Sequence, residues 1–498
     1  MVSRKLSILF LISVILAFLA GYFAERILPS SPSSNAGDMF DYIMESFDNY
    51  YYYDIDDEQV HEAFIANMEA SINKIAELNN DPYTRLLAVP LASSPSDDEK
   101  FVGVGISFVF EGLDLRVGYV YPQGASHKKI YPNDLIVGVV EDETSIYFKD
   151  LDHQESVLDY LKGDLGETKS LIVKNPDDQE EVVTITYQEI LTPTAYTKDL
   201  DETHIAYIKI ERFAGATDSS LGTAQVFQNI LNQLETQTLN GENKTLILDL
   251  RDNPGGALTA LHNQGAQSML PGITQQLLRR NLEAPLFTMI PKSGTVQSFY
   301  GGLSAPKDYD IKVLVNEHSA SAAEVLAAAL SVEGGYELYG RPTYGKGVYQ
   351  NQVRLKDIRN TRYYLVYTEG SWFYGDHLNV SDTPLVVNVI DPSGIHAIDM
   401  PVYHGEMSYD HVYASLANYQ AFFNVYYQLE GLDKLRTDGY FDQATKDIVF
   451  QFNTEFELSG QTIHLLTARK IHELYVDYLL DVTKDDELQH LIQVIKSS

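Results

Sequence analysis

The stretch KTLILDLRDNPGG, residues 244–256, decides the fold class of this chain. Its first seven residues form a near-continuous apolar run, which is typical of a strand covered on both faces of a sheet. A second such run, IKVLV at 311–315, leads into the helical sequence AAEVLAAALSV at 322–332. Strands and helical stretches alternate between 195 and 402. This alternation predicts an α/β core with helices packed on its sheet.

The segments on either side of this core have different patterns. Residues 101–190 contain the short alternating stretches GISFVFEG, DLRVGYVY, DLIVGVV, KSLIVKN and EVVTITY, with one helical stretch at 153–161. They predict a compact, mainly β module. Residues 38–89 have helical spacing and close in the turn signal NDPY at 80–83. The pattern is helical again from 411 to the end, with breaks at Gly431, Asp438-Gly439 and Gly460.

The N-terminus predicts the compartment. Arg4 and Lys5 precede an apolar run from Leu6 to Ala24. As a helix this run spans about 28 Å, which is close to the thickness of the hydrocarbon core of a bilayer. The preceding basic residues keep the N-terminus in the cytoplasm. A cleaved signal peptide is the alternative, although the run is long for one and has no clean cleavage site. We expect an uncleaved single-pass anchor, with the bulk of the chain outside the cytoplasmic membrane.

Composition excludes several classes of function. The 498 residues suggest three or four domains, and the net charge of −34 argues against nucleic-acid binding, which needs a basic face. The chain has no cysteine, so disulfides, a cysteine nucleophile and thiolate zinc sites are excluded. The thirteen histidines show no metal-binding spacing. We expect no metal and no cofactor.

The first candidate for chemistry is the loop at 251–256, RDNPGG. Its proline stops the strand, and Gly255 and Gly256 allow a positive φ that turns backbone N–H groups outward. Such a loop can form an oxyanion hole, although an NPGG sequence is a simple turn in most proteins.

The second candidate is Ser321, which stands between a strand and a helix. A serine there has an exposed hydroxyl at the positive end of the helix dipole. An N-cap serine is the alternative, but the small residues Ala320, Ala322 and Ala323 leave room for a substrate backbone. His318 is a poor partner for Ser321, because a residue so near in sequence more often faces away across the turn.

The third candidate is Lys346, within TYGKGVYQ at 343–350. A serine needs a base, and lysine serves only if its pKa falls by about 3 units, which corresponds to about 4 kcal/mol of differential desolvation. An apolar pocket can supply that, and Gln350 could orient the amine without adding charge. A solvated surface lysine is the alternative reading.

Ser321 within SASAAE and Lys346 within YGKGVYQ, 25 residues apart, resemble the motifs of the carboxyl-terminal processing (tail-specific) serine peptidases. The LDLRDNPGG loop matches that family in the right order, and Ala323 and Tyr344 are mild departures from its usual motifs. The resemblance implies that Ser321 is the nucleophile, Lys346 the base and Gln350 its support. It also implies an oxyanion hole formed by Ala322 and Gly255 or Gly256.

Residues 101–190 resemble the PDZ domain of that family, in which a loop captures the carboxylate of a peptide tail. The resemblance assigns this role to Val102, Gly103, Val104, Gly105 and Ile106. KIYPND at 129–134 stands where the family's PDZ domain usually has a stretch rich in small residues. GIHAID at 394–399 lacks the proline that family members usually have beyond the peptidase core.

The region 411–475 resembles small helical peptidoglycan-binding repeats, with a helical cap that binds nothing as the alternative. The expected domains are an anchor (1–29), an N-terminal helical segment and linker (30–99), a PDZ domain (100–191), an α/β peptidase core (192–405) and a small helical domain (406–498). A homodimer through the terminal helical segments is a further implication of the resemblance.

The sequence thus predicts an α/β multidomain, membrane-anchored serine endopeptidase of the Ser–Lys type that cleaves proteins with exposed C-terminal tails, with peptidoglycan as a further expected partner. A non-catalytic PDZ and wall-binding adaptor is the rival, but both Ser321 and Lys346 are present. A wall-modifying amidase is a third reading, and it lacks the metal or Cys–His site that such enzymes need.

Overall fold

The computed structural model describes residues 57–90, 100–217, 220–241, 243–263, 271–358 and 361–497. The chain divides into two units, Met1–Asn80 and Asp81–Ser498, which are described separately. The predicted anchor, 1–29, lies outside the described residues, as do residues 30–56 and 91–99 of the predicted N-terminal helical segment and linker. No helix in the described ranges combines the length and the apolar character that a bilayer crossing requires.

The described part of the first unit is one long helix, α3 (Asp57–Leu78). Of the helical segment predicted over 38–89, the structure describes the part from residue 57 onward, and α3 ends at Leu78. The chain leaves the helix at Asn79 and Asn80, and Asn80 has a left-handed φ of 52°. Residues Arg85–Pro90 then form a strand, β1, and not a helix. The helical prediction was wrong there because long-range pairing with a distant strand overrides a local pattern.

Residues 100–191 form the predicted β-rich domain. An antiparallel sheet has the order β3-β4-β5-β7-β8, with β6 beside β5, while β2 pairs with β9. Each of the five stretches quoted above forms a strand, and the predicted helix is α4 (Gln154–Leu161). The strands are β2 (Lys100–Gly103), β3 (Ile106–Glu111), β4 (Asp114–Val120), β5 (Leu135–Glu141), β6 (Thr144–Tyr147), β7 (Thr168–Lys174), β8 (Glu180–Thr186) and β9 (Gln188–Leu191).

The predicted α/β core has a six-stranded sheet in the order β10-β11-β12-β15-β16-β19. All neighbours are parallel except β10 and β11. The strands are β10 (Ala195–Thr197), β11 (Ile205–Ile210), β12 (Thr245–Asp249), β15 (Asp310–Val315), β16 (Glu337–Gly340) and β19 (Asn388–Val389). Its helices are α5 (Thr223–Thr236), α6 (Leu258–Leu261), α7 (Ile273–Leu277) and α8 (Ala322–Ala328), which continues as a π-helical turn over Ala329–Glu333.

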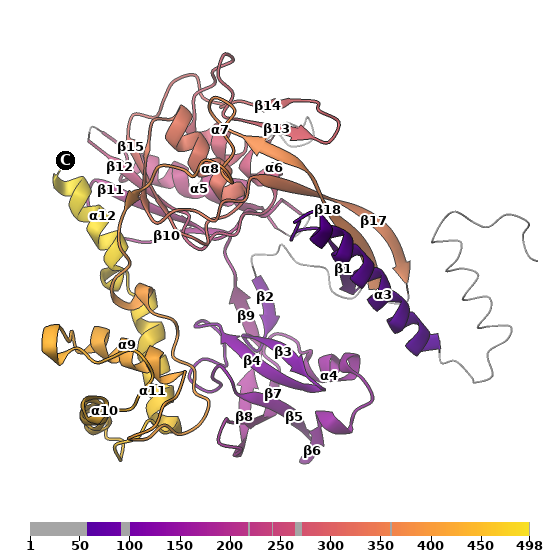
Figure 1. The fold of residues 1–498 in the computed structure, drawn as a ribbon, viewed down its shortest axis with the longest axis vertical. Coiled ribbons are helices and arrows are strands. Elements are labelled where there is room, and N and C mark those ends of the chain that lie inside the picture. Colours follow the sequence, from indigo (N-terminus) through magenta and orange to yellow (C-terminus); the bar gives the residue numbers. More distant parts are fainter. Residues whose placement is uncertain are drawn as a thin grey trace, which may run out of the picture. The chain divides into compact units, whose positions relative to one another are not determined.

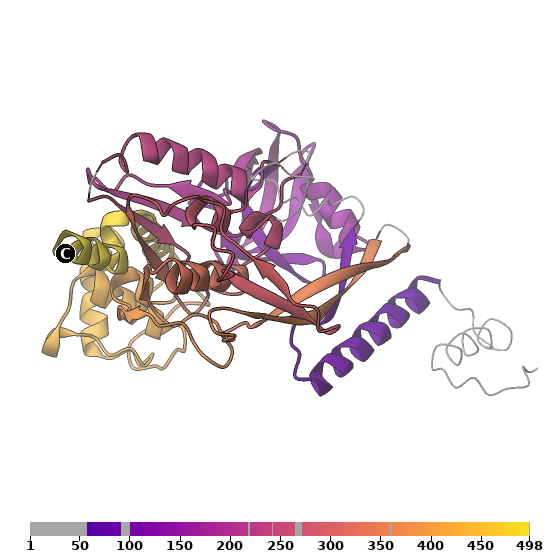
Figure 2. The ribbon, with the colours of Figure 1, turned by 90° about the horizontal axis from the view of Figure 1, so that it is seen from above.

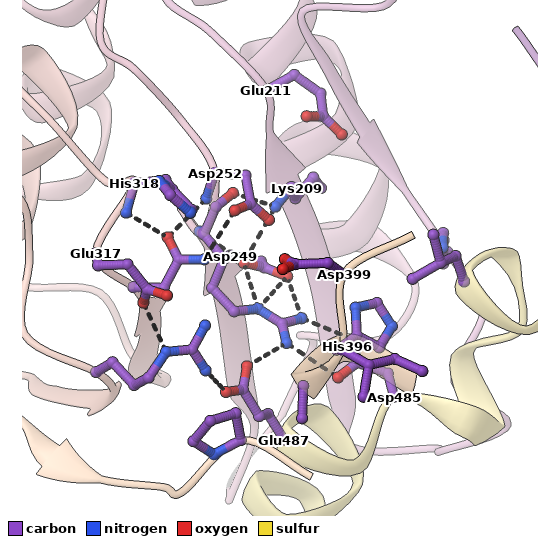
Figure 3. Close-up of a pocket in the computed structure, with 18 of the residues that line it drawn as sticks. Lys209, Glu211, Asp249, Asp252, Glu317, His318, His396, Asp399, Asp485 and Glu487 are labelled. Carbon is purple, nitrogen blue, oxygen red and sulfur yellow. Dashed lines mark hydrogen bonds and ion pairs between the residues drawn. The ribbon is translucent and has the colours of Figure 1, made fainter. Parts of the chain in front are cut away.

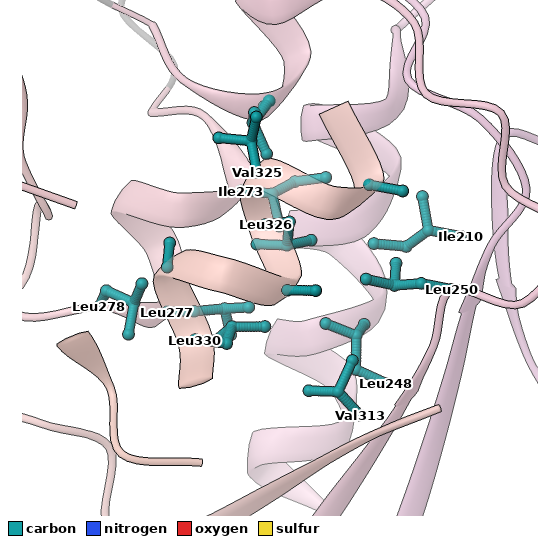
Figure 4. Close-up of a cluster of buried hydrophobic side chains, with 14 of the residues drawn as sticks. Ile210, Leu248, Leu250, Ile273, Leu277, Leu278, Val313, Val325, Leu326 and Leu330 are labelled. Atoms are coloured by element: carbon teal, nitrogen blue, oxygen red, sulfur yellow. The ribbon is translucent and has the colours of Figure 1, made fainter. Parts of the chain in front are cut away.

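Both faces of the core sheet are covered, as the apolar runs predict. Alternate strand residues such as Leu248 and Val313 pack against Leu326 and Leu330 of α8 and its continuation (Figure 4). The strand residues between them, which point to the other face of the sheet, form a second cluster with the last helix of the chain, α12 (Asp486–Ser497). Its members from the sheet include Ile247 and Leu314, and those from α12 are Leu488, Leu491 and Ile492.

A second, antiparallel sheet extends from the core as a long hairpin (Figure 1 and Figure 2). Strand β17 (Val348–Ile358) pairs with β18 (Thr361–Phe373) from its first residue to its last, with irregularities after Tyr349 and Arg354. The other edge of β18 binds β1 and, nearer the core, β13 (Phe287–Pro291), which pairs in turn with β14 (Gln297–Phe299). This sheet therefore brings the residues just after Asn80 to the hairpin that follows Lys346.

The predicted C-terminal helices are α9 (Leu416–Tyr426), α10 (Gln443–Glu455) and α11 (Leu465–Leu480). They share an aromatic-rich core that includes Tyr419, Phe422 and Phe452. The prediction of a small helical domain over 406–498 differs from the structure in one respect. The last helix, α12, packs on the peptidase sheet because its apolar face fits the uncovered side of that sheet.

Candidate active site

The loop after β12 is held by the side chain of Asn253. Its Nδ2 donates to the carbonyl of Ile210 (2.8 Å), and its Oδ1 accepts the N–H of Gly255 (2.8 Å). Its carbonyl accepts the N–H of Ala320 (2.9 Å), on the neighbouring loop. One fully buried side chain therefore fixes the glycine turn, and its backbone ties that turn to the loop that carries Ser321.

Ser321 lies at the start of α8 in a strained conformation. Its φ is 56° and its ψ is −117°, which is uncommon for a residue other than glycine and costs about 1–3 kcal/mol. Such strain persists only where the surrounding structure imposes it, and it is concentrated at functional sites. The turn places Ser321 on the wall of a cavity that Lys346 also lines.

Glu324 connects the nucleophile loop to the lysine loop. Its carboxylate is fully buried, and Oε2 accepts the backbone N–H groups of Ser321 and Lys346, each at 2.9 Å. Its Oε1 accepts the N–H of Gly345 at 2.6 Å. Three charge-assisted hydrogen bonds therefore set the distance between the two predicted catalytic residues. The sequence offered a signal for this role, since Glu324 stands three residues after a helix-capping serine.

Lys346 lies just before β17 with a half-buried side chain. Burial, together with the nearby charge of Arg85, lowers the pKa of its amine, although Glu324 and Asp81 oppose the shift. A lowered pKa is what a lysine base requires, because only the neutral amine can accept a proton. Among the described residues no hydrogen bond joins the Lys346 amine to Ser321. The amine lies instead over the ring of Tyr83, 4.4 Å from its centroid.

Gln350 lines the same cavity but is not hydrogen-bonded to Lys346 in the part of the chain described here. Its Nε2 donates to Oγ1 of Thr368 (3.4 Å), and Thr368 donates to Oδ1 of Asp81 (2.9 Å). The predicted support of Lys346 by Gln350 therefore remains a prediction.

The cavity beside Ser321 has a volume of about 520 Å³. Its polar lining residues are Ser321, Lys346, Gln350, Gln297 and Glu369. The remaining walls are largely apolar and include Leu258, Phe287, Met289, Val325 and Trp372. A concave, mainly apolar pocket with a few polar side chains in its wall is typical of substrate sites.

Of the predicted oxyanion donors, Gly256 and Ala322 line the cavity, whereas Gly255 is buried and donates its N–H to Asn253. Gly256 has a φ of 133°, and a Cβ there would come within 2.1 Å of the carbonyl oxygen of Phe213. Neither the Gly256 nor the Ala322 N–H has an acceptor among the described residues. Both are therefore available to a substrate oxygen.

Arg251, in the same loop, is buried in an ion-pair network that the sequence did not predict. Its guanidinium binds Asp249, Asp485 and Glu487 at 2.6–2.9 Å. Figure 3 shows these three carboxylates around one cation. Arg341 also binds Glu487, and Lys209 donates to the Arg251 carbonyl. Burial alone would raise the pKa of Asp485, but the hydrogen bond and charge of Arg251 hold it below its ordinary value.

This network lines a second cavity of about 530 Å³, which also includes His318. His318 is absent from the wall of the Ser321 cavity, in agreement with the expectation that it faces away from the serine. In the described ranges no group of three or more His, Asp or Glu residues is arranged to hold a metal ion.

The predicted tail-binding residues lie at the junction of β2 and β3. Val102 and Gly103 pair with β9, and Ile106 begins β3, which is an edge strand of its sheet. Gly105 has a φ of 81°, and a Cβ there would lie 2.6 Å from the Cα of Gly124. The N–H groups of Val104 and Gly105 have no acceptor among the described residues.

Three residues of this site were not predicted from the sequence. Asn253 and Glu324 lie inside the quoted motifs. The spacing of Glu324 from Ser321 is a helix-capping signal that could have identified it, whereas the buried hydrogen bonds of Asn253 have no signature in the sequence. Tyr83 is far from Lys346 along the chain, and only its turn signal was recognised. Its contact depends on the pairing of β1 with β18.

Comparison with known proteins agrees with this site. Residues 204–381 match peptidase family S41. The carboxy-terminal processing protease CtpB of Bacillus subtilis is 26% identical over 473 residues, 92% of this chain and 89% of that protein. A carboxyl-terminal-processing protease of Picosynechococcus is 31% identical over 58% of this chain and 65% of its own length.

A solved structure, the photosystem II D1 C-terminal processing protease, is similar with 22% identity and a TM-score of 0.37. The similarity covers 65% of this chain and 81% of that one. The family match spans β11, β12 and β15 with the loops that carry Gly256, Ser321 and Lys346. Residues 204–381 of this chain therefore match peptidase family S41, and the relatives named above are carboxyl-terminal processing proteases.

Proposed function

We propose that this serine peptidase is anchored in the membrane, acts outside it, and cleaves proteins whose C-terminal tails bind its β-rich domain as a PDZ domain. One observation carries the catalytic part. A strained serine, a lysine of lowered pKa and two unoccupied backbone N–H groups line one apolar cavity.

The chemistry proceeds in two steps. The neutral amine of Lys346 accepts the proton of the Ser321 hydroxyl as the oxygen bonds to the scissile carbonyl carbon. The carbonyl oxygen becomes an oxyanion, which the N–H groups of Gly256 and Ala322 stabilise. The C–N bond breaks, and the Lys346 ammonium returns its proton to the leaving amine. Water, with Lys346 again as base, hydrolyses the acyl-enzyme.

In this state the amine of Lys346 rests on Tyr83, so it must turn toward Ser321 before the first proton transfer. Catalytic hydrogen bonds are often absent until substrate binds. Glu324 already fixes the backbones of both residues, so only the lysine side chain has to move. The apolar walls of the cavity favour an uncharged side chain next to the scissile bond.

Tail recognition is supported by the free edge of β3 and by the free N–H groups of Val104 and Gly105. An extended peptide can pair with such an edge while its carboxylate accepts the loop N–H groups. Membrane anchoring rests on residues 4–24, and peptidoglycan binding on the motif residues of 411–475. A homodimer is supported by the apolar stripe of α3, which leaves Ile75 and Leu78 largely exposed.

Cleavage by the full-length protein in mild detergent tests the catalytic part. The substrate is a loosely folded protein with an apolar tail, and intact mass identifies the products. We expect Ser321→Ala and Lys346→Ala each to abolish cleavage. Lys356→Ala, which removes an exposed lysine from the same hairpin, retains it. Equal cleavage by the Ser321→Ala variant would refute the assignment.

A pair of glycine variants tests tail recognition. Gly105→Ala introduces a clash with Gly124, so KM for the tailed substrate rises about tenfold or more while cleavage of a short tail-free peptide is unchanged. Gly112→Ala is the control, because Gly112 also has a positive φ but has open space around it. An equal effect of both variants, or an equal effect on both substrates, contradicts tail recognition by this loop.

A further inference from the structure

The side chain of Tyr83 is the partner of the Lys346 amine in this structure. The amine lies 4.4 Å from the ring centroid, within the range of a cation–π interaction. The same amine has no hydrogen bond and no ion pair among the described residues. The ring is therefore the one group in the described chain that contacts the amine specifically.

The position of Tyr83 is fixed by a turn that is bound to the catalytic hairpin. Oδ1 of Asp81 accepts the N–H of Tyr83 (3.0 Å), and Oδ2 accepts the hydroxyl of Thr84 (2.6 Å). Thr368 of β18 donates its N–H to Thr84 and its hydroxyl to Asp81. The following strand, β1, then pairs with β18 from Arg85 onward. The ring is thus held by the same hairpin whose first strand follows Lys346.

We propose that Tyr83 is a positioning residue for Lys346, and that its ring holds the ammonium that forms when Ser321 is deprotonated. The proton leaves the Ser321 hydroxyl, and Lys346 gains a positive charge while the serine oxygen bonds to the carbonyl carbon. That charge needs stabilisation in a half-buried site until the proton passes to the leaving amine. The face of an aromatic ring supplies it without accepting the proton.

The charges around the amine agree with this role. Arg85 repels a protonated lysine, whereas Glu324 and Asp81 attract it. Neither carboxylate bonds the amine directly, because both are occupied by backbone and hydroxyl donors. Burial, together with a hydrogen bond to Tyr344, raises the pKa of Tyr83 to about 12. The phenol therefore stays neutral at working pH, so the ring acts through its π face and not as an anion.

The test compares kcat/KM against pH for wild type, Tyr83→Phe and Tyr83→Leu, with a short chromogenic peptide that needs no tail. The acid limb of this profile reports the free-enzyme pKa of the base. Without the ring, we expect the plateau to fall about 3- to 30-fold and the acid limb to move down by about 0.5–1.5 pH units. Tyr83→Phe keeps the ring and stays within about twofold of wild type on both measures.

Two further proteins keep the test decisive if Tyr83→Leu folds poorly. A fluorinated phenylalanine at position 83 keeps the shape of Phe but weakens the ring quadrupole, so it changes both measures in the direction of leucine. Arg85→Gln removes a repelling charge and moves the acid limb upward, in the opposite direction. Thermal melting of each variant identifies losses that come from unfolding.

The inference rests on the assignment of Ser321 and Lys346 as nucleophile and base. If Ser321→Ala or Lys346→Ala retains wild-type cleavage, that assignment fails. If both abolish cleavage but Tyr83→Leu keeps the plateau and the acid limb of wild type, the role of Tyr83 alone is refuted. A loss in Tyr83→Phe as large as that in Tyr83→Leu also refutes it, because the hydroxyl and not the ring would then carry the effect.

Discussion

The substitution Glu487→Gln tests whether the last helix of the chain supports the catalytic loop. The Glu487 carboxylate is 2% exposed and binds two arginines, Arg251 at 2.9 Å and Arg341. Arg251 stands two residues before Asn253, which fixes the glycine turn beside Ser321. Glutamine keeps the shape of the side chain but removes the charge that balances the two guanidinium groups.

The magnitude follows from the number of bonds and their burial. Each hydrogen bond to a charged group contributes about 1.5–3 kcal/mol, and breaking a buried ion pair costs about 3–5 kcal/mol. We expect Glu487→Gln to lower the free energy of unfolding by about 3–5 kcal/mol. We also expect kcat to fall by tenfold or more with KM within about threefold, because Glu487 contacts the loop from outside the substrate cavity.

The chain contains one tryptophan, Trp372, which gives a local probe for this measurement. It is buried in the cavity wall and donates its indole N–H to the Lys346 carbonyl. Urea unfolding followed by its fluorescence therefore reports on the peptidase core. Asp486→Asn is the matched control, since the neighbouring Asp486 is exposed and binds only Ser393 among its described partners. We expect this control to cost less than about 1 kcal/mol.

The result that would refute this reasoning is simple. If Glu487→Gln and Asp486→Asn differ by less than about 0.5 kcal/mol in unfolding free energy and both keep wild-type kcat, the ion-pair network neither stabilises the core nor supports the catalytic loop.

Three other changes test the site and the fold. Glu324→Gln offers an amide where two acceptor oxygens are needed, so kcat should fall about 10- to 100-fold in steady-state assays, and an unchanged kcat contradicts the linking role of Glu324. Gly256→Ala brings a Cβ against Phe213, so we expect loss of cleavage with a retained circular dichroism spectrum, and activity near wild type would exclude Gly256 as an oxyanion donor. Burial raises the pKa of Asp134 from 3.8 to about 6, so the folded state binds the extra proton and wild-type stability falls as pH rises between these values. Asp134→Asn should therefore raise stability by about 1–3 kcal/mol at pH 8 and leave it unchanged near pH 3, which calorimetry at the two pH values can measure.

The sequence predicted much of the core because its signals are local. A strand buried on both faces needs apolar residues at odd and at even positions. The runs KTLILDL and IKVLV therefore predicted a sheet that is covered on both faces. A serine between a strand and a helix, and a lysine between glycines, are likewise visible without a structure. The helical prediction failed at Arg85–Pro90, where a partner strand from a distant part of the chain determines the conformation.

By itself the sequence determined the order of the three loops and predicted Gly255 or Gly256, Ser321 and Lys346 as their reactive positions. Only the tertiary structure decided which distant groups surround them. The ring of Tyr83 reaches Lys346 through strand pairing, and Glu487 reaches Arg251 because α12 covers the second face of the sheet. Residue periodicity records whether a position is buried, but not which segment buries it, since many segments of similar apolar pattern could cover the same face.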